Sequence, residues 1–478
     1  MRLERNPGLR AFLDHRLLPG RVRAHPGCLL LRVITDSPPP ATMELNGKKI
    51  AVLGCGSSGV AAARLALAKG AAEVCIFDAN PAATCSEPGV GFVPGATGEH
   101  ARAYAADLVV LSPGIESDIP WTLAFTAHGA PLIGETELAW HYYGGRIIAI
   151  TGTNGKTTTT ALLEHVLLSA GRTAKACGNY GYPLSDVALM EPQPEFAVLE
   201  VSSFQMETII DFRPEVAIWL NFAPDHMDRY TKVEDYFNAK LRIFENMSAD
   251  QLAIVREGEE LPALTPKRVG FSSVVSTGQL YFEEGAICEA GRPLTPLRGT
   301  PLEQAHNAEN AMATTLACRA VGLDDATISA AIRSFNPPGH RCETVAEMDG
   351  VLWLNDSKST NLHSTEAAVR SQTRPIILLA GGKDKGLDYS AINPMLEQKA
   401  RVCIVFGQIA DQLEQTFSPV CRVVKVTTVQ EAVAAAHKVA QRGDVVLFSP
   451  GTSSFDQFTG YVQRGQCFRD AVKQILHL

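Results

Sequence analysis

A short apolar run at Ile147 to Ile150 leads directly into a glycine-containing loop and then into a helical pattern. The run is rich in β-branched residues, as a strand buried in a parallel sheet is. Beyond the loop, apolar residues recur on one side of the helical pattern, and Gly171 stands where a helix would end. A strand, a loop and a helix in this order fold as one unit, with the loop at the carboxyl end of the strand. We therefore expect an α/β fold built on parallel sheet.

The loop between this strand and helix carries the residues of a phosphate-binding loop. Gly152 and Gly155 precede Lys156 and Thr157. In such a loop, backbone N–H groups and the helix N-terminus surround the phosphates, the lysine reaches the outer phosphates, and the threonine hydroxyl takes Mg²⁺. Ile150 stands where the usual pattern has its first glycine, so this loop is a shortened variant. The sequence predicts that the protein binds ATP here.

Length and composition indicate a soluble enzyme of several domains. The 478 residues are too many for one ordinary core and suggest about three domains. A net charge of -8 gives no general affinity for nucleic acid or membrane, and no segment is long and apolar enough to span a membrane. The 11 cysteines include no Cys-x-x-Cys pair, which favours reduced thiols in a cytoplasm over disulfides or a zinc site.

Residues 1–42 differ from the rest of the chain in composition. They are rich in arginine, poor in acidic residues and contain the run Pro38 to Pro40. We expect a disordered extension, or translated upstream sequence with Met43 as the true start. A transit peptide is the alternative, because such peptides are also rich in arginine and poor in acids.

The first expected domain, residues 43–143, contains a second glycine-rich turn. Gly54 to Gly59 reads G-x-G-x-x-G between a strand and the helical pattern Val60 to Lys69. Another strand, Val74 to Phe77, ends at Asp78, about where an acidic residue contacts a ribose hydroxyl in a Rossmann fold. Alone, the pattern suggests NAD and an oxidoreductase. It indicates a unit shaped for a pyrophosphate, whichever nucleotide carries it.

The second expected domain, residues 144–334, places two ligand-type side chains after strands. Glu200 follows the apolar strand Phe196 to Leu199, where a second contact to Mg²⁺ is expected beside a phosphate loop. His226 lies just past the strand Val216 to Leu220. A histidine there is either a surface residue or a ligand, and the residues alone leave both interpretations open.

Two helical patterns in this domain also leave alternatives open. Lys240 falls in the middle of the apolar face of a helix expected at 233–244. Its amine either reaches out to water or is buried for a chemical reason. Asn307 and Asn310 are three residues apart on one helical face, where they either cap the helix or hold an adenine edge.

The third expected domain, residues 335–478, repeats the alternation of strand, glycine and helix. Strands are expected at Ile376 to Leu379, Val402 to Phe406 and Val445 to Phe448. This alternation again predicts a parallel, Rossmann-like sheet with ligands at its carboxyl edge.

Taken together, several short motifs resemble the Mur ligases, which add amino acids to the peptidoglycan precursor. They are Gly152 to Thr158, Leu199 to Gln205, Asp225 to Tyr230, His306-Asn307 with Asn310, Gly339 to Arg341, Asn355 to Lys358, Ser364 to Glu366 and Ser449 to Phe458. They occur in order from about Met43 to the end. Gly451 to Ser453 and Gln463 to Gly465 depart from the usual family residues near the expected amino-acid pocket.

Within the family, two motifs are most similar to the members that add D-glutamate. They are Asp225 to Tyr230 and Ser202 to Gln205. The Asp-Asn-Pro-Arg motif that recognises diaminopimelate is absent from the sequence. Folylpolyglutamate synthetases share the ATP domain but lack the preceding Rossmann-like domain. Another amino-acid-adding Mur ligase and an NAD-dependent oxidoreductase remain as alternatives.

The resemblance implies an ATP-dependent ligase that joins D-glutamate to UDP-N-acetylmuramoyl-L-alanine through an acyl phosphate. It implies two Mg²⁺ ions, carbamylation of Lys240 by CO₂, and catalytic roles for Lys156, His226 and Lys240. The metal ligands would be Thr157, Glu200, His226 and Lys240. The protein would act in the cytoplasm as a monomer, without nucleic acid or membrane insertion.

The resemblance also assigns residues to each substrate. ATP would contact Gly152, Thr153, Asn154, Gly155, Lys156, Thr157, Thr158, Asn307, Asn310, Arg341, Asp356 and Lys358. The UDP-sugar would contact Ser57, Ser58, Gly59, Asp78, Asn179 and Ser202. The glutamate pocket would consist of Thr360, Lys385, Ser454, Phe455 and Tyr461.

Overall fold

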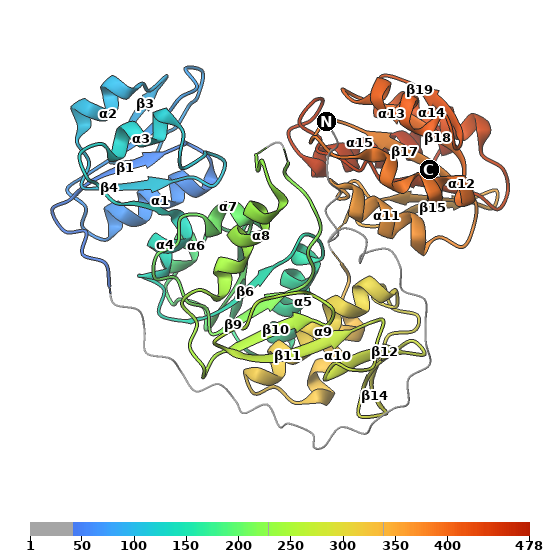
Figure 1. Ribbon diagram of the computed structural model, residues 1–478, viewed down its shortest axis with the longest axis horizontal. Coiled ribbons are helices and arrows are strands. Elements are labelled where there is room, and N and C mark those ends of the chain that lie inside the picture. Colours follow the sequence, from blue (N-terminus) through green and yellow to red (C-terminus); the bar gives the residue numbers. More distant parts are fainter. Residues whose placement is uncertain (1–41, 228, 338) are drawn as a thin grey trace, which may run out of the picture. The chain divides into compact units, whose positions relative to one another are not determined.

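The computed structural model describes residues 42–227, 229–337 and 339–478, which form three successive β-sheets with flanking helices (Figure 1). This confirms the expected α/β class. The disordered extension predicted for residues 1–42 falls, apart from its last residue, outside the described residues. Within the part that is described, no helix is both long enough and apolar enough to cross a membrane.

The first sheet is parallel throughout, in the order β3-β2-β1-β4-β5. Its strands are β1 Lys49–Leu53, β2 Glu73–Asp78, β3 Gly91–Pro94, β4 Leu108–Leu111 and β5 Leu132–Gly134. Its helices are α1 Ser57–Ala68, α2 Gly98–Tyr104, α3 Pro120–Thr126 and α4 Glu135–Trp140. Helix α1 begins three residues earlier than expected. A Cβ on Gly59 would lie 2.0 Å from Gly54 O, so only glycine lets α1 pack this closely on the turn.

The second sheet has nine strands in the order β14-β13-β12-β11-β10-β9-β6-β8-β7. Its strands are β6 Arg146–Thr151, β7 Ala174–Gly178, β8 Phe196–Glu200, β9 Val216–Trp219, β10 Leu252–Arg256, β11 Lys267–Ser272, β12 Leu280–Glu283, β13 Ala286–Glu289 and β14 Arg292–Pro296. Its helical segments are α5 Lys156–Ser169, α6 Leu184–Ala188, α7 Ser203–Met206, α8 Val233–Leu241, η2 Arg242–Phe244, α9 Ala305–Ala320 and α10 Asp325–Ser334.

The second sheet is parallel, as expected of a central ATP-binding sheet, except at one edge. Strands β12, β13 and β14 pair antiparallel through two-residue turns. Glu284 and Gly285 in the first turn, and Ala290 and Gly291 in the second, all have positive φ. Two successive residues with positive φ make the turn that joins antiparallel strands tightly.

The third sheet has the order β15-β16-β20-β17-β18-β19 and is parallel except for β15. Its strands are β15 Glu343–Met348, β16 Val351–Asn355, β17 Ile376–Gly381, β18 Ala400–Phe406, β19 Arg422–Lys425 and β20 Val445–Phe448. Its helical segments are α11 Leu362–Ser371, η3 Tyr389–Ile392, α12 Asn393–Lys399, α13 Ala410–Phe417, α14 Val429–Val439 and α15 Tyr461–Leu476. The antiparallel pairing of β15 was not expected.

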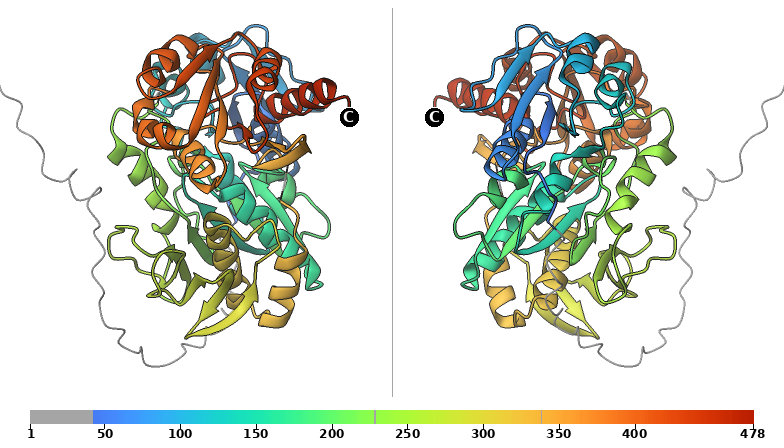
Figure 2. Two further views of the ribbon diagram at one scale, coloured as in Figure 1. Left: turned by 90° about the vertical axis from the view of Figure 1, so that its right-hand side faces the viewer. Right: turned by 90° about the vertical axis from the view of Figure 1, so that its left-hand side faces the viewer.

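Strands of the third sheet bury both of their faces, which is why they appear as continuous apolar runs in the sequence. Ile376 and Leu378 belong to one buried cluster, whereas Ile377 and Leu379 belong to another. Successive side chains of a strand point to opposite faces, so helices must cover both sides of the sheet. The helices on either side of the orange strands can be followed in Figure 2.

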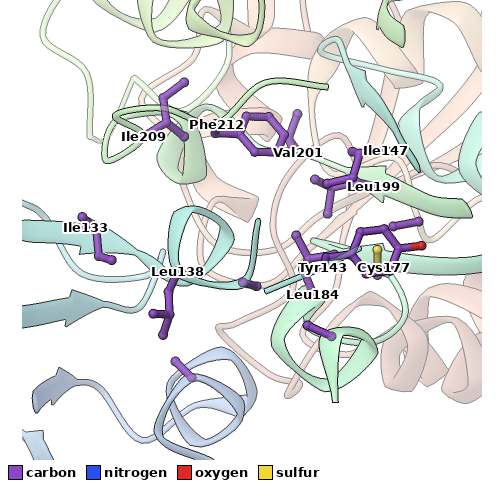
Figure 3. Close-up of a cluster of buried hydrophobic side chains, with 14 of the residues drawn as sticks. Ile133, Leu138, Tyr143, Ile147, Cys177, Leu184, Leu199, Val201, Ile209 and Phe212 are labelled. Atoms are coloured by element: carbon purple, nitrogen blue, oxygen red, sulfur yellow. The ribbon is translucent and has the colours of Figure 1, made fainter. Parts of the chain in front are cut away.

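Strand β6 lies between β8 and β9 and delivers the phosphate loop. Ile147 and Leu199, on neighbouring strands, lie in one buried cluster with Val201 (Figure 3). Residues Ile147 to Ile150 are at most 4 % exposed. The burial of this strand holds the loop that follows it on a rigid base.

Candidate functional site

Two cavities meet at the loop between β6 and α5. Cavity A, about 580 Å³, is lined by this loop, by Glu200 and His226, and by residues that follow strands of the third sheet: Lys358, Thr360, Asn361, Lys383, Asp384, Lys385, Ser453, Ser454, Phe455, Gly460 and Tyr461. Cavity B, about 480 Å³, is lined at the N-terminal end of α9 by Gln304, Ala305, His306, Glu309 and Asn310, and on α11 by Ser364, Glu366, Ala367, Ala368, Arg370 and Ser371. Asn154, Gly155, Arg341 and Ser364 line both cavities. The carboxyl ends of parallel strands, where ligands bind in such folds, therefore form the centre of the site.

The phosphate loop turns sharply at Gly155, and its lysine side chain donates to two carbonyl groups of the same loop. Gly155 has φ of +85°, and a Cβ there would lie 2.4 Å from Asn310 Oδ1. Lys156 Nζ donates to Gly152 O at 2.8 Å and to Thr153 O at 2.9 Å. Burial lowers the pKa of Lys156. A phosphate at the N-terminus of α5 offers this ammonium a stronger, charged partner than the two carbonyls.

A hydroxyl in the first turn of α5 and a carboxylate at the end of β8 face each other. Thr157 Oγ1 donates to Glu200 Oε2 at 2.7 Å. The other carboxylate oxygen accepts from Asn179 Nδ2 at 2.8 Å, which fixes its orientation. Glu200 is 2 % exposed, so its carboxyl group is shielded from bulk water. Oxygen ligands of this kind, beside a phosphate loop, suit Mg²⁺.

Lys240 is buried inside the site, so the interpretation that its amine reaches out to water is wrong. The residue is 2 % exposed, and its Nζ donates to Gly152 O at 3.1 Å. The same Nζ lies 4.7 Å from the centre of the Tyr236 ring. Burial, and then repulsion from Lys156, lower the pKa of Lys240 well below its usual value. Helix α8, which carries Lys240, ends at Leu241 and continues as the 3₁₀ turn η2.

His226 lines cavity A and has a left-handed backbone conformation, with φ of +57°. Its ring packs edge-on against Phe204, with ring centres 4.9 Å apart. Burial lowers the pKa of His226 to about 4, so the imidazole is neutral at pH 7. The neutral imidazole is the form that binds metal ions.

Asp225, next to His226, receives two side chains from the third sheet. Lys385 Nζ lies 3.0 Å from Asp225 Oδ1, and Asn361 Nδ2 donates to Oδ2 at 3.0 Å. Burial alone would raise the pKa of Asp225, but the charges of Lys385 and His226 and these hydrogen bonds hold it at about 2. Lys385, predicted to hold a substrate carboxylate, therefore contacts a carboxylate of the protein itself in this structure.

The side chains of cavity B suit a nucleotide base and an anion. Asn310 Oδ1 accepts from Thr159 Oγ1 at 3.2 Å, and Asn310 Nδ2 donates to Asn307 Oδ1 at 3.3 Å. Both asparagines lie inside α9, whose N-cap is Gln304, so the interpretation that they cap the helix is wrong. Among the described residues, the buried Nε of Arg341 has no hydrogen-bond partner. Arg341 lines both cavities, and a guanidinium at that place suits a phosphate.

The residues predicted to bind the UDP-sugar lie in two separate places, one in cavity A and the other at the first sheet. Asn179 and Ser202 line cavity A, and Ser202 also caps α7 by accepting from Gln205 N at 3.3 Å. Asp78 ends β2 and accepts from Cys55 N in the glycine turn at 3.0 Å. Asp78, Ser57, Ser58 and Gly59 do not line either cavity. They form a separate turn at the carboxyl edge of the first sheet.

The five residues predicted for the glutamate pocket all line cavity A, as do Lys156, Thr157, Lys358, Glu200, His226 and Lys240. Lys358 Nζ lies 5.0 Å from the ring centre of Tyr461 and 5.6 Å from that of Tyr180. Burial lowers the pKa of Lys358 to about 7. Phe455 is 68 % exposed and lies at the rim.

The remaining residues predicted to contact ATP differ in position. Asp356 lines cavity B while accepting from Ser449 Oγ at 2.8 Å. Gly152, Thr158 and Asn307 are buried and line neither cavity.

Asn361 and Tyr180 are among the residues that line cavity A and that sequence reasoning did not assign to a site. Asn361 caps α11 through Ser364 N, and an asparagine before a helical pattern is a signal that could have located it. Tyr180 follows β7 in a short turn, and its position opposite Lys358 has no local sequence signal.

Comparisons with known proteins identify relatives along most of the chain. Residues 150–280 match the "Mur ligase middle domain" family, and residues 340–451 match the "Mur ligase, glutamate ligase domain" family. The UDP-N-acetylmuramoylalanine--D-glutamate ligase of Acidobacterium capsulatum is 37 % identical over 90 % of this chain and 97 % of its own. The enzyme of the same name from Koribacter versatilis is 37 % identical over 91 % of this chain and 99 % of its own.

Solved structures of the same fold come from other ligases. The UDP-N-acetylmuramate-alanine ligase MurC of Thermotoga maritima has a TM-score of 0.58 and 19 % identity, over 90 % of this chain and 100 % of its own. MurF ligase of Thermotoga maritima, solved in complex with ADP, has a TM-score of 0.55 and 15 % identity, over 91 % of this chain and 98 % of its own. At this identity the likeness concerns the fold.

Proposed function

The chain belongs to the Mur ligase family, and from this premise we propose that it is an ATP-dependent ligase that joins D-glutamate to UDP-N-acetylmuramoyl-L-alanine in peptidoglycan precursor synthesis. The observation that carries the proposal is cavity A. It brings a phosphate loop, a magnesium-type pair and the residues predicted for glutamate into one space. An oxidoreductase would leave these groups without a role, so the NAD-dependent alternative is not favoured.

The reaction forms an amide at the cost of one ATP. An oxygen of the alanyl carboxylate attacks the terminal phosphorus of ATP, ADP leaves, and an acyl phosphate forms. The amine of D-glutamate then attacks the carbonyl carbon, phosphate leaves with the former carboxylate oxygen, and the nitrogen loses its extra proton. Lys156 offsets negative charge on the transferred group in the first step, and the walls of the cavity exclude water from the acyl phosphate.

The chain's residues fit two magnesium ions, which would neutralise phosphate charge and orient the oxygens of ATP. Thr157 and Glu200 would hold one ion, because their oxygens already face each other at 2.7 Å. The neutral imidazole of His226 and an oxygen from Lys240 would hold the other. Lys240 can supply oxygen only when carbamylated, and its buried amine of low pKa suits that modification.

Substrate assignments follow the two cavities and the first sheet. ATP would occupy cavity B with its phosphates at the loop, where Arg341 and Asn310 lie. The uridine diphosphate would bind the glycine turn of the first sheet, because a Cβ on Gly56 would meet no heavy atom within 4 Å and the backbone there is open to a pyrophosphate. D-glutamate would bind at the end of cavity A near Thr360 and Ser454.

We further propose the domain bounds 43–143, 144–334 and 335–478, and action as a monomer in the cytoplasm. The experiment that tests the function is amide formation from purified enzyme, UDP-N-acetylmuramoyl-L-alanine, ATP and D-glutamate. Product of the added glutamate mass supports it, and absence of ligation with all substrates present contradicts it.

A further inference from the structure

Two loops of the third sheet line the same end of cavity A. One loop, Gly382 to Gly386, follows β17 and contains Lys385, and the other, Ser449 to Gly460, follows β20 and contains Ser454. Lys383 N donates to Ser453 O at 2.9 Å, so the two backbones touch. A Cβ on Gly382 would lie 2.2 Å from Ser453 O, and only glycine permits this approach.

Thr452 joins these loops through its side chain. The residue is 0 % exposed, and its Oγ1 donates to Lys383 O. The same hydroxyl contacts the phenol of Tyr389, and that phenol donates to Asp384 Oδ1 at 3.2 Å. A single buried hydroxyl therefore holds both ends of the segment that carries Lys385.

Arg464 fixes Thr452 in turn from the opposite side. Arg464 is 0 % exposed. Its Nη1 donates to Thr452 O at 3.0 Å, and its Nη2 donates to Ser357 O at 2.8 Å. Because Ser357 directly precedes Lys358, the Arg464 guanidinium also holds the segment after β16 in which Lys358 lines cavity A. Thr452 thus lies in a rigid network between the two loops.

We propose that Thr452 is a positioning residue for the amino-acid substrate, which fixes Lys385 relative to Ser454. This inference rests on the proposed function, and Thr452 lies where the sequence departs from the usual family residues. Loss of the hydroxyl leaves Lys383 O without this donor and frees the segment from Lys383 to Tyr389. Binding of D-glutamate then weakens, whereas the ATP residues on α5 and α9 stay in place.

The test compares Thr452→Val, which keeps the shape and loses the hydroxyl, with Thr452→Ser, which keeps the hydroxyl. Thr344→Val, at an exposed position of β15, is the matched control. We expect Thr452→Val to raise the KM for D-glutamate about fivefold to fiftyfold and to leave the KM for ATP within about twofold. Thr452→Ser and Thr344→Val should resemble the wild type.

Hydrogen exchange gives a readout that does not depend on activity. Backbone amides of residues 383–389 should exchange faster in Thr452→Val than in Thr344→Val. If Thr452→Val does not fold, Thr452→Ala against Thr452→Ser gives the same comparison. An unchanged KM for D-glutamate, or equal rises in KM for all substrates, overturns the inference. A wild type that does not ligate D-glutamate overturns the proposed function instead.

Discussion

Removal of CO₂ from the enzyme tests the role proposed for Lys240. Its amine is 2 % exposed and lies against Gly152 O, and burial lowers its pKa well below the usual value. A lowered pKa means that the amine is neutral at every pH above that value, and only the neutral amine attacks CO₂. We therefore expect ligation to slow in CO₂-free buffer and to recover when bicarbonate is added.

The expected size of the effect follows from the geometry at Gly152. Lys240 Nζ and Lys156 Nζ both donate to the same carbonyl oxygen, at 3.1 and 2.8 Å. The two nitrogens are thus at most roughly 6 Å apart, and the negative charge of a carbamate at that distance attracts the Lys156 ammonium by about 3 kcal/mol at an effective dielectric constant of about 20. The neutral amine that remains without CO₂ lacks this attraction. We expect its loss to lower kcat/KM by about a hundredfold.

The assay measures ADP formation by the wild type, Lys240→Ala and Lys232→Ala, with and without bicarbonate. Lys232 is the exposed N-cap of the same helix and provides the control. Bicarbonate should restore ADP formation by the wild type and by Lys232→Ala but not by Lys240→Ala. Acetate should partly restore ADP formation by Lys240→Ala, because it replaces the lost carboxylate oxygens. Isotopically labelled bicarbonate should give a carbamate NMR signal. A wild type that is fully active and unlabelled without CO₂ refutes the reasoning.

Lys156→Ala should slow ADP formation about a hundredfold or more, because no other loop side chain offsets charge on the outer phosphates, and near-normal turnover would contradict this role. Lys385→Ala should raise the KM for D-glutamate far more than that for ATP, whereas Lys473→Ala, at an exposed lysine of α15 that lines neither cavity, should change neither; a rise in both KM values for Lys385→Ala would count against the pocket. Burial raises the pKa of Glu135 from 4.5 to about 7, so the stability of the folded state falls as pH rises through that window. In urea unfolding, Glu135→Gln should therefore be more stable than the wild type by about 3 kcal/mol above pH 7 and should lose this advantage below pH 4.5. A stability difference between the two proteins that does not change with pH would show another cause.

Local physics explains what the sequence predicted correctly. Burial of both faces makes β6, β17 and β20 continuous apolar runs, and the phosphate loop is recognised by residues adjacent in the chain. The antiparallel edge was missed because Glu284-Gly285 and Ala290-Gly291 lack the asparagine or aspartate that usually marks such turns. Their neighbouring strands are also short.

Contacts between distant parts of the chain could not be predicted in the same way. Asp225 meets Asn361 and Lys385 through tertiary packing, and no spacing in the sequence encodes those pairs. Burial of Lys240 was one of two open alternatives, because periodicity placed it on an apolar face without showing what covers that face. Tyr180 gave no signal because its partner Lys358 lies on another sheet.

The measurement that tests the central claim most directly is phosphate release from ATP in the presence of UDP-N-acetylmuramoyl-L-alanine, with and without an added amino acid. Cavity A joins the phosphate loop to the residues proposed to bind glutamate, so turnover should depend on both the UDP-sugar and D-glutamate. L-Glutamate should not replace D-glutamate, because its amine would point away from the acyl phosphate once both carboxylates are held. Phosphate release that is independent of any amino acid, or equal with both enantiomers, would contradict the account.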